Sequence, residues 1–144
     1  MVDGRCQMAD DDGSNKRPRL KDCALMKDNY HTLIEGRKVQ LVPYRRKFVE
    51  NYNEWMKDPY ILEMTASEPL SLQEEFDMQK SWAEDHTKCT FIILSRDSES
   101  VGESSDELQR MAGDVNLFLN DRDDKGIAEI EVMVAEESCR NKGR

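Results

Sequence analysis

The chain has 144 residues, of which 38% are hydrophobic and 35% are charged, and its formal net charge is −9. This length favours a single domain, and the negative charge argues against binding to nucleic acid or to an anionic membrane, because both need clustered positive charge. No run reaches the roughly 18 apolar residues of a membrane span. An acidic surface that aids solubility is the preferred interpretation, and a basic substrate or partner is the alternative.

The first 29 residues differ from the rest of the chain. Acidic and basic side chains are mixed there with few large apolar ones, so the segment buries too little surface to offset its ordering entropy. We predict a disordered extension over residues 1–29, with Met26 as an internal start. The chain shows no signal peptide and no close cysteine pair for zinc, so we expect a reduced, cytoplasmic protein without a metal. The basic run Lys16–Lys21 leaves nuclear import as an alternative.

Apolar periodicity predicts one strand and two helices in the first half of the folded part. Lys38–Val42 alternates polar and apolar residues, as a strand does. Apolar side chains at helical spacing predict an amphipathic helix over Arg45–Lys57, which Asp58-Pro59 ends. Ile61–Thr65 fits no single pattern. A capping box opens a second helix over Ser71–Glu84.

Three more strands are predicted in the second half. Cys89–Leu94 is a continuous apolar run, typical of a buried strand. Ser95–Arg110 is rich in serine and acidic residues and is interpreted as a loop. Met111–Leu119 and Ala128–Val134 flank the turn-forming segment Asn120–Gly126, so we predict an antiparallel hairpin. The order of elements indicates an α/β (α+β) fold.

Two glutamates on the last predicted strand are candidates for acid–base chemistry. Glu129 and Glu131 are two residues apart, so both point to one face of the sheet. Neighbouring carboxylates suit a general base whose pKa is raised by its neighbour, and a solvated strand face is the alternative. Ile130, Val132 and Val134 alternate with them and are expected to point into the core.

Asp114 and Asn116 share one face of the preceding strand in the same way. They are candidates for lining a substrate groove, but ordinary exposure to solvent is the preferred interpretation. The large aromatic residues Tyr44, Trp55 and Trp82 are expected to pack in a core rather than bind a ligand.

The final residues, Ser138–Arg144, have the pattern of an anion-binding loop. Such a loop follows a strand and opens a helix, whose free N–H groups hold phosphate oxygens. Arg140 and Lys142 bring positive charge, and Gly143 allows close approach of the backbone. The sequence stops inside this loop, so we expect a truncated catalytic domain.

Three segments of the chain resemble the GCN5-related N-acetyltransferase (GNAT) superfamily and, within it, the N-acetyltransferase 9 branch. They are LIEGRKVQLVPY (33–44), residues 52–94, which include TASEPLSLQEE, and residues 112–143, which include GDVNLFL. The resemblance covers essentially all of residues 26–143. It implies a GNAT-type mixed, mainly antiparallel sheet with flanking helices, incomplete after the fourth strand. Residues 30–144 would then form the N-terminal part of an acetyltransferase domain.

The resemblance also implies an activity, the transfer of an acetyl group from acetyl-CoA to an amine of a protein or peptide. In that fold the fourth-strand backbone pairs with the pantetheine arm, which maps to Val132, Met133 and Val134. The pyrophosphate loop, Arg/Gln-x-x-Gly-x-Gly/Ala, maps to Arg140, Asn141, Lys142, Gly143 and Arg144. An acidic residue on the fourth strand deprotonates the amine, a role that falls to Glu129 or Glu131.

The end of the chain limits these expectations. The last Gly/Ala of the loop, the helix behind it and the fifth strand would all follow Arg144, so this chain is expected to be inactive or weakly active. The alternative is a non-catalytic interaction module. Its partner would be tubulin, with which the family is associated, or another cytoplasmic protein, bound through the acidic surface or the exposed edge of the last strand.

Overall fold

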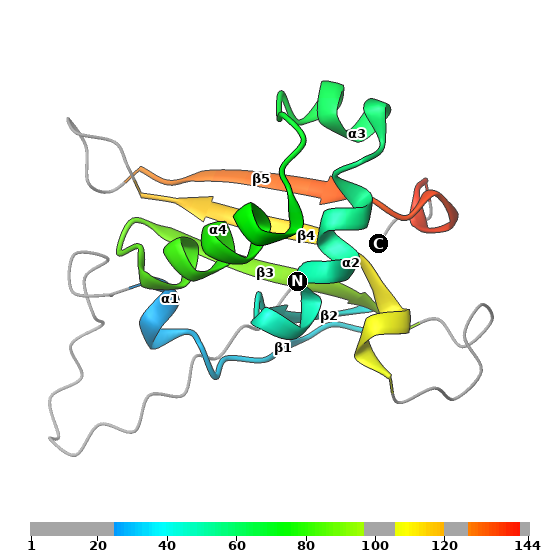
Figure 1. Cartoon of the computed structure of the whole chain (residues 1–144). Helices are drawn as coiled ribbons and strands as arrows, with labels where there is room; N and C mark the ends of the chain where they lie inside the picture. Colours follow the sequence, from blue (N-terminus) through cyan, green and yellow to red (C-terminus); the bar gives the residue numbers. More distant parts are fainter. Residues whose placement is uncertain (1–24, 97–105, 120–126, 142–144) are drawn as a thin grey trace, which may run out of the picture.

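A five-stranded antiparallel sheet forms the centre of the computed structural model, which describes residues 25–96, 106–119 and 127–141 (Figure 1). The strands lie side by side in chain order, so each pairs with the next along the sequence. They are β1 (Ile34–Glu35), β2 (Val39–Pro43), β3 (Lys88–Ser95), β4 (Met111–Phe118) and β5 (Glu129–Val134). The four predicted strands are therefore confirmed as β2 to β5, and the two-residue β1 is added at the edge.

The helices are short, apart from one. They are α1 (Leu25–Asp28), α2 (Val49–Trp55), α3 (Pro59–Met64) and α4 (Leu72–Glu84), with 3-10 turns η2 (Arg46–Phe48), η3 (Glu107–Arg110) and η4 (Glu137–Cys139). The first predicted helix is divided into η2 and α2. α1 lies at the end of the segment predicted to be disordered. Residues 1–24, with the basic run at 16–21, lie outside the described residues.

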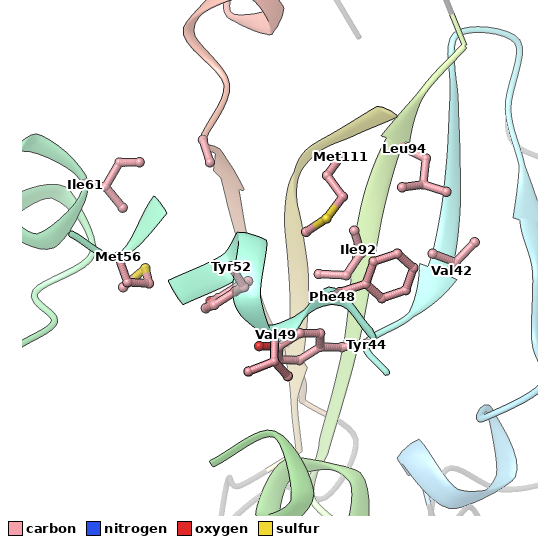
Figure 2. Close-up of a cluster of buried hydrophobic side chains, with 11 residues drawn as sticks. Val42, Tyr44, Phe48, Val49, Tyr52, Met56, Ile61, Ile92, Leu94 and Met111 are labelled. Atoms are coloured by element: carbon pink, nitrogen blue, oxygen red, sulfur yellow. The ribbon is translucent and has the colours of Figure 1, made fainter. Parts of the chain in front are cut away.

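α2 and α4 cover one face of the sheet (Figure 1). The main core lies between them and the central strands, where Phe48 and Val49 meet Ile92 and Leu94, all of them nearly or completely buried (Figure 2). The tilted rings of Tyr44 and Tyr52 pack against each other within this core, with centroids 4.9 Å apart. These large apolar side chains, removed from water together, hold the helices on the sheet.

Asp58 and Pro59 end one helix and also begin the next. The Asp58 carboxylate accepts a hydrogen bond from the Tyr60 backbone N–H at 2.9 Å, and Pro59 occupies the first helical position, where its missing N–H costs nothing. Ile61 then faces the core. The segment that fitted no single pattern is thus helix α3. The capping box predicted at the start of α4 is confirmed, with both Ser71 and Glu74 making their reciprocal bonds.

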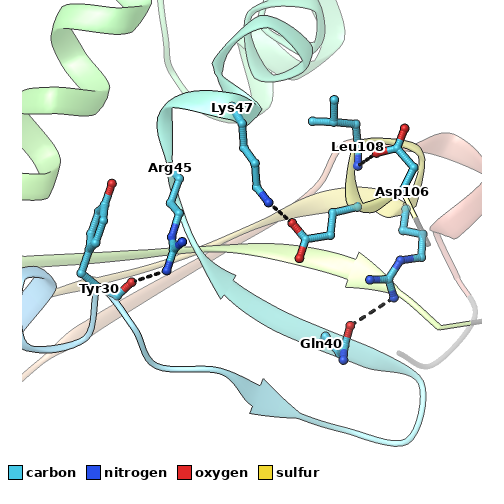
Figure 3. A network of polar contacts seen from close by, with 8 residues as sticks. Tyr30, Gln40, Arg45, Lys47, Asp106 and Leu108 are labelled. Carbon is cyan, nitrogen blue, oxygen red and sulfur yellow. Dashed lines mark hydrogen bonds and ion pairs between the residues drawn. The ribbon is translucent and has the colours of Figure 1, made fainter.

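Polar side-chain contacts connect the segments around β2 with η3 and with the segment before β1 (Figure 3). Lys47 pairs with Glu107 of η3, and the Arg110 guanidinium donates to the Gln40 side chain at 3.1 Å. Arg45 donates to the Tyr30 carbonyl at 2.8 Å. Part of the predicted loop between β3 and β4 is therefore the ordered turn η3, and residues 97–105 of that loop lie outside the described residues.

The apolar side of β5 corrects one expectation. Ile130, Val132 and Val134 are 65%, 62% and 38% exposed, so they do not enter the core. Their antiparallel pairing places Ile130 beside Leu117 and Val132 beside Val115, on the face away from α2 and α4. The only helices described over this part of the sheet lie on the other side, where Met133 packs against the core. Alternation predicted the two faces of β5 correctly, but not which face is covered.

Candidate functional site

Two connected grooves lie beside β5. The first, here called the polar groove, has a volume of about 560 Å³ and runs between the helices and the inner face of β3 to β5. It is lined by Tyr52, Met56, Met64, Thr65, Ala66, Ser67, Trp82, Lys88, Asp114, Asn116, Glu131, Val132 and Met133. The second, here called the edge groove, has a volume of about 480 Å³. It is lined by Tyr60, Ile61, Met64, Thr65, Val132, Met133, Val134, Arg140 and Asn141.

A chain of hydrogen bonds forms the floor of the polar groove. Asp114 and Asn116 are buried, at 2% and 7% exposure, which corrects the expectation that they face solvent. Tyr52 Oη donates to Asp114 Oδ2 at 3.0 Å, and Asn116 Nδ2 donates to the same oxygen at 2.9 Å. Thr90 Oγ1 donates to Asn116 Oδ1 at 2.7 Å. The alternative that these two residues line a groove is the one that the structure supports.

Burial controls the ionisation of this floor. Loss of water raises the pKa of Asp114, while the hydrogen bonds from Tyr52 and Asn116 and the charge of Lys88 oppose the rise. Burial also raises the pKa of Tyr52 well above its ordinary value, and the Asp114 charge adds to that effect. Tyr52 therefore remains a hydrogen-bond donor at any physiological pH, and it holds the carboxylate in one orientation.

The two predicted catalytic glutamates differ in their surroundings. Glu131 lies opposite Asn116 in the β4–β5 register and lines the polar groove. Glu129 lies opposite Phe118 and lines neither groove, and both glutamates are exposed. The structure thus brings Glu131, but not Glu129, close to the buried polar floor.

Lys88 was not among the sequence candidates, although it contributes a cation to the same groove. It is only 7% exposed, and its Nζ lies 3.2 Å from the ring centroid of Trp82 and 4.6 Å from that of Phe118. Burial lowers its pKa to about 8, although the charges of Asp114, Glu131 and Asp85 favour the ammonium form. No local pattern indicates this contact, because a lysine at the start of a strand is an ordinary polar residue at a strand boundary.

The wall of the polar groove opposite the sheet is the end of α3. The Ala66 N–H donates to the Glu63 carbonyl at 3.2 Å, and the Ser67 N–H donates to the Leu62 carbonyl at 2.9 Å. This is a Schellman motif, which requires a left-handed residue at the position of Ala66. Ala66 adopts it, with φ of 49°. Glycine is the usual residue there, so the wall of the groove holds backbone strain.

Several of the predicted cofactor residues come together in the edge groove. Val132, Met133 and Val134 line it along β5, and Arg140 and Asn141 line its end. Among the described residues β5 pairs with β4 alone, so its outer backbone edge is open. The predicted Lys142, Gly143 and Arg144 lie outside the described residues.

Two neighbouring residues, Gly113 and Arg140, shape the edge groove near Val134. A Cβ on Gly113 would lie 1.9 Å from the Met133 carbonyl oxygen, so only glycine lets β5 approach β4 this closely. Arg140 turns back on its own strand, where Nε donates to the Val134 carbonyl at 3.0 Å and Nη2 to the Ala135 carbonyl at 2.9 Å. Its guanidinium also lies 5.0 Å from the centroid of the Tyr60 ring.

A third depression, of about 420 Å³, lies between α2 and η3. Two of its polar side chains bond to neighbouring groups of the protein. Trp55 Nε1 donates to Glu136 at 2.8 Å, and Asn51 donates to the Leu108 carbonyl at 3.3 Å. Over residues 25–96, 106–119 and 127–141, no cluster of three metal-ligating side chains occurs, and no helix is long and apolar enough to cross a membrane.

Comparison with known proteins identifies the family. No family model matches the chain. The N-acetyltransferase 9-like protein of Nematostella vectensis is 51% identical over 118 residues, which are 82% of this chain and 59% of that protein. The alpha/beta-tubulin-N-acetyltransferase 9 of Homo sapiens is 50% identical over 119 residues, 82% of this chain and 58% of that protein. The chain belongs to the N-acetyltransferase 9-like family.

The fold of this family member agrees with that of a solved acetyltransferase. The spermidine N-acetyltransferase from Vibrio cholerae, solved in complex with CoA and spermine, superposes with a TM-score of 0.56 and 17% sequence identity over 75% of this chain and 57% of that chain. The GNAT-type α+β fold is thereby confirmed. The chain spans a little under 60% of the length of the relatives named above.

Proposed function

We propose that this chain is part of an N-acetyltransferase that binds acetyl-CoA in the edge groove and the acceptor amine in the polar groove. One observation carries the proposal. The two grooves meet at Val132 and Met133, so a donor lying along β5 would reach the polar groove beside Glu131. The fold shared with an acetyltransferase and the names of the relatives support the same assignment.

The edge groove fits the extended arm of acetyl-CoA. The open backbone edge of β5 offers N–H and C=O groups to an amide-bearing ligand, as a neighbouring strand would. Arg140 stands at the end of this groove, where the pyrophosphate would lie, and its guanidinium now donates to backbone carbonyls. Binding of the phosphates would exchange those carbonyls for anionic oxygens, which are stronger acceptors.

The polar groove supplies the groups that an amine acceptor needs. Acetyl-CoA provides an activated acetyl thioester. Transfer forms the amide C–N bond as the C–S bond breaks, and CoA leaves as a thiolate that takes up the second proton lost by the amine nitrogen. Glu131 would accept the proton that the ammonium group must lose before it attacks. Asp114, fixed by Tyr52 and Asn116, would stabilise and orient the positively charged amine on the groove floor.

The matched variants Glu131→Gln and Glu129→Gln test this assignment against the weak activity expected of this chain. Both remove one carboxylate from the same strand, but only Glu131 lines the groove. We expect Glu131→Gln to lower the rate of acetyl transfer to a peptide amine about 100-fold or more, with Glu129→Gln near the wild-type rate. Calorimetry should show the same affinity of all three proteins for acetyl-CoA. Equal losses in the two variants, or no acetyl-CoA binding to the wild type, would contradict the proposal.

The acceptor is proposed to be a protein or peptide amine in the cytoplasm, with tubulin suggested by the name of the human relative. The second candidate function is a non-catalytic interaction module. The exposed apolar face of β5 favours it, because large exposed apolar patches mark interaction surfaces. A protein that binds tubulin equally well with and without Glu131→Gln, and shows no affinity for acetyl-CoA, would favour the module over the enzyme.

A further inference from the structure

The ammonium group of Lys88 is the one charge of the polar groove that the proposed chemistry does not use. Lys88 is more than nine-tenths buried, yet it lines the groove. Within the described part of the chain, its Nζ makes contacts with the rings of Trp82 and Phe118 and has no ion-pair partner. The fold therefore holds a cation between two aromatic rings with one side toward the groove.

A buried ammonium needs more than ring contacts. Its desolvation is costly, and cation–π contacts offset part of that cost. The ammonium carries three N–H donors, and an aromatic face is a weak acceptor for them. Tyr52 and Asn116 both donate to Asp114 Oδ2, and among the described residues Asp114 forms no ion pair with Lys88. Lys88 thus retains donor capacity that a ligand in the groove can use.

The charges around Lys88 form a pattern along the groove. From β4 and β5, Asp114 and Glu131 face the groove, and Asp85 adds a negative charge at the end of α4. Lys88 belongs to β3, which is separated from β5 by β4, so it lies farther from the edge groove than Glu131 does. A ligand that matches this pattern carries an amine near Glu131 and an anionic group deeper in the groove.

We infer that Lys88 recognises a carboxylate of the acceptor, so that the preferred acceptor is a peptide whose amine is followed closely by an acidic side chain. The inference rests on the proposed function, because it takes the polar groove to be the acceptor site. Lys88 is a specificity-determining residue in this scheme. It is not assigned a proton transfer, and it would act on acceptor affinity more than on the rate of the chemical step.

Binding of peptides without acetyl-CoA tests the inference directly. The chain has two tryptophans, so Trp55→Phe leaves Trp82, which touches Lys88, as the only tryptophan reporter. The titrants are peptides with a free amino terminus and one glutamate at the second, third or fourth residue, each compared with its glutamine counterpart. We expect at least one glutamate peptide to bind about tenfold more tightly than its partner, as a charged hydrogen bond allows.

Two substitutions separate recognition from a structural role. Lys88→Met in the same background keeps the apolar stem and should abolish the glutamate preference, whereas Lys88→Arg should restore part of it. A lysine with only a structural role would, on replacement by Met, change the affinity for both peptides of a pair by the same factor. That result, or no glutamate preference in the Lys88 protein, or no peptide binding at all, would overturn the inference. Because no acetyl-CoA is present, failure of acetyl transfer would count against the proposed function alone.

Discussion

Lys88 and Asp114 are charged residues of opposite sign that the fold removes from water in the same groove. Each is costly to bury alone, and each is held by contacts from other elements of the fold, namely Trp82 and Phe118 for the lysine and Tyr52 for the aspartate. Buried charged side chains with shifted pKa values cluster at functional sites, including sites that bind charged ligands. The cost should be visible in the stability of the protein.

The effect of pH on stability should report the buried ammonium of Lys88. Its pKa is about 8 in the folded chain and near 10.5 in the unfolded chain. Below pH 8, Lys88 is charged in both the folded and the unfolded chain, so its full desolvation cost lowers the free energy of unfolding. Between pH 8 and 10.5 the unfolded chain binds more protons than the folded chain, so the stability of the wild type rises with pH. Lys88→Met should therefore be more stable at pH 7 by an amount on the order of 1–3 kcal/mol, and the difference should shrink toward pH 10.5.

Denaturant unfolding at a series of pH values measures this difference. Lys80→Met is the matched control, since Lys80 is exposed on α4, and it should change stability little at any pH. Each variant is compared with the wild type at the same pH, so the contribution of other titrating groups to the free energy of unfolding cancels in the difference. A difference for Lys88→Met that stays constant from pH 7 to 10.5 would show that the lysine keeps its ordinary pKa.

Alternation predicted which residues share a face, but it did not predict the environment of that face. Asp114 and Asn116 were correctly placed together, yet their burial depends on α2, which brings Tyr52 over β4. Glu129 and Glu131 are equivalent in the sequence, and only the assembled groove separates them. Lys88 and Trp82 meet between β3 and α4 and carry no local signal of this contact.

Local signals were sufficient for most elements and misleading at one junction. Four strands and the capping box of α4 follow from apolar pattern and side-chain chemistry within a few residues. Asp58-Pro59 was interpreted as a helix end, whereas it is also a helix start, because an aspartate cap followed by proline suits the first turn. The two residues of β1 are too few to show any periodicity.

The strained end of α3 gives a prediction for one element. Ala66 has a positive φ, which glycine adopts without the steric cost that a Cβ imposes. Relief of this steric cost by Ala66→Gly should stabilise the chain by about 1 kcal/mol. The larger conformational entropy of glycine in the unfolded chain offsets part of that gain. Ala83→Gly, in the last turn of α4, is the control and should destabilise by up to about 1 kcal/mol. Thermal and denaturant unfolding of the three proteins measure both effects, and a loss of stability in Ala66→Gly would show that the turn is unstrained.

In the molecule as a whole, the two faces of the sheet differ in what covers them. α2 and α4 cover the inner face, while the outer face of β5 presents three apolar side chains to solvent. β5 is also an edge strand among the described residues, with backbone groups free to pair. An exposed edge beside an apolar row is the combination that promotes association between chains.

We therefore expect copies of this chain to associate through β5, and Ile130→Lys to oppose that association. Ile130 is 65% exposed and points away from the side of Glu131, so a lysine there loses little burial and leaves the polar groove unchanged. A charge on an edge strand disfavours strand pairing, since it would have to be buried or placed against its own symmetry mate. Sedimentation of the wild type over a concentration series should show association that Ile130→Lys shifts to at least tenfold higher concentration, a change of about 1.4 kcal/mol. Leu72→Lys, at an exposed apolar position on α4, is the control and should associate like the wild type. A monomeric wild type, or equal shifts in both variants, would mean that the edge of β5 is protected by its own twist and acidic side chains.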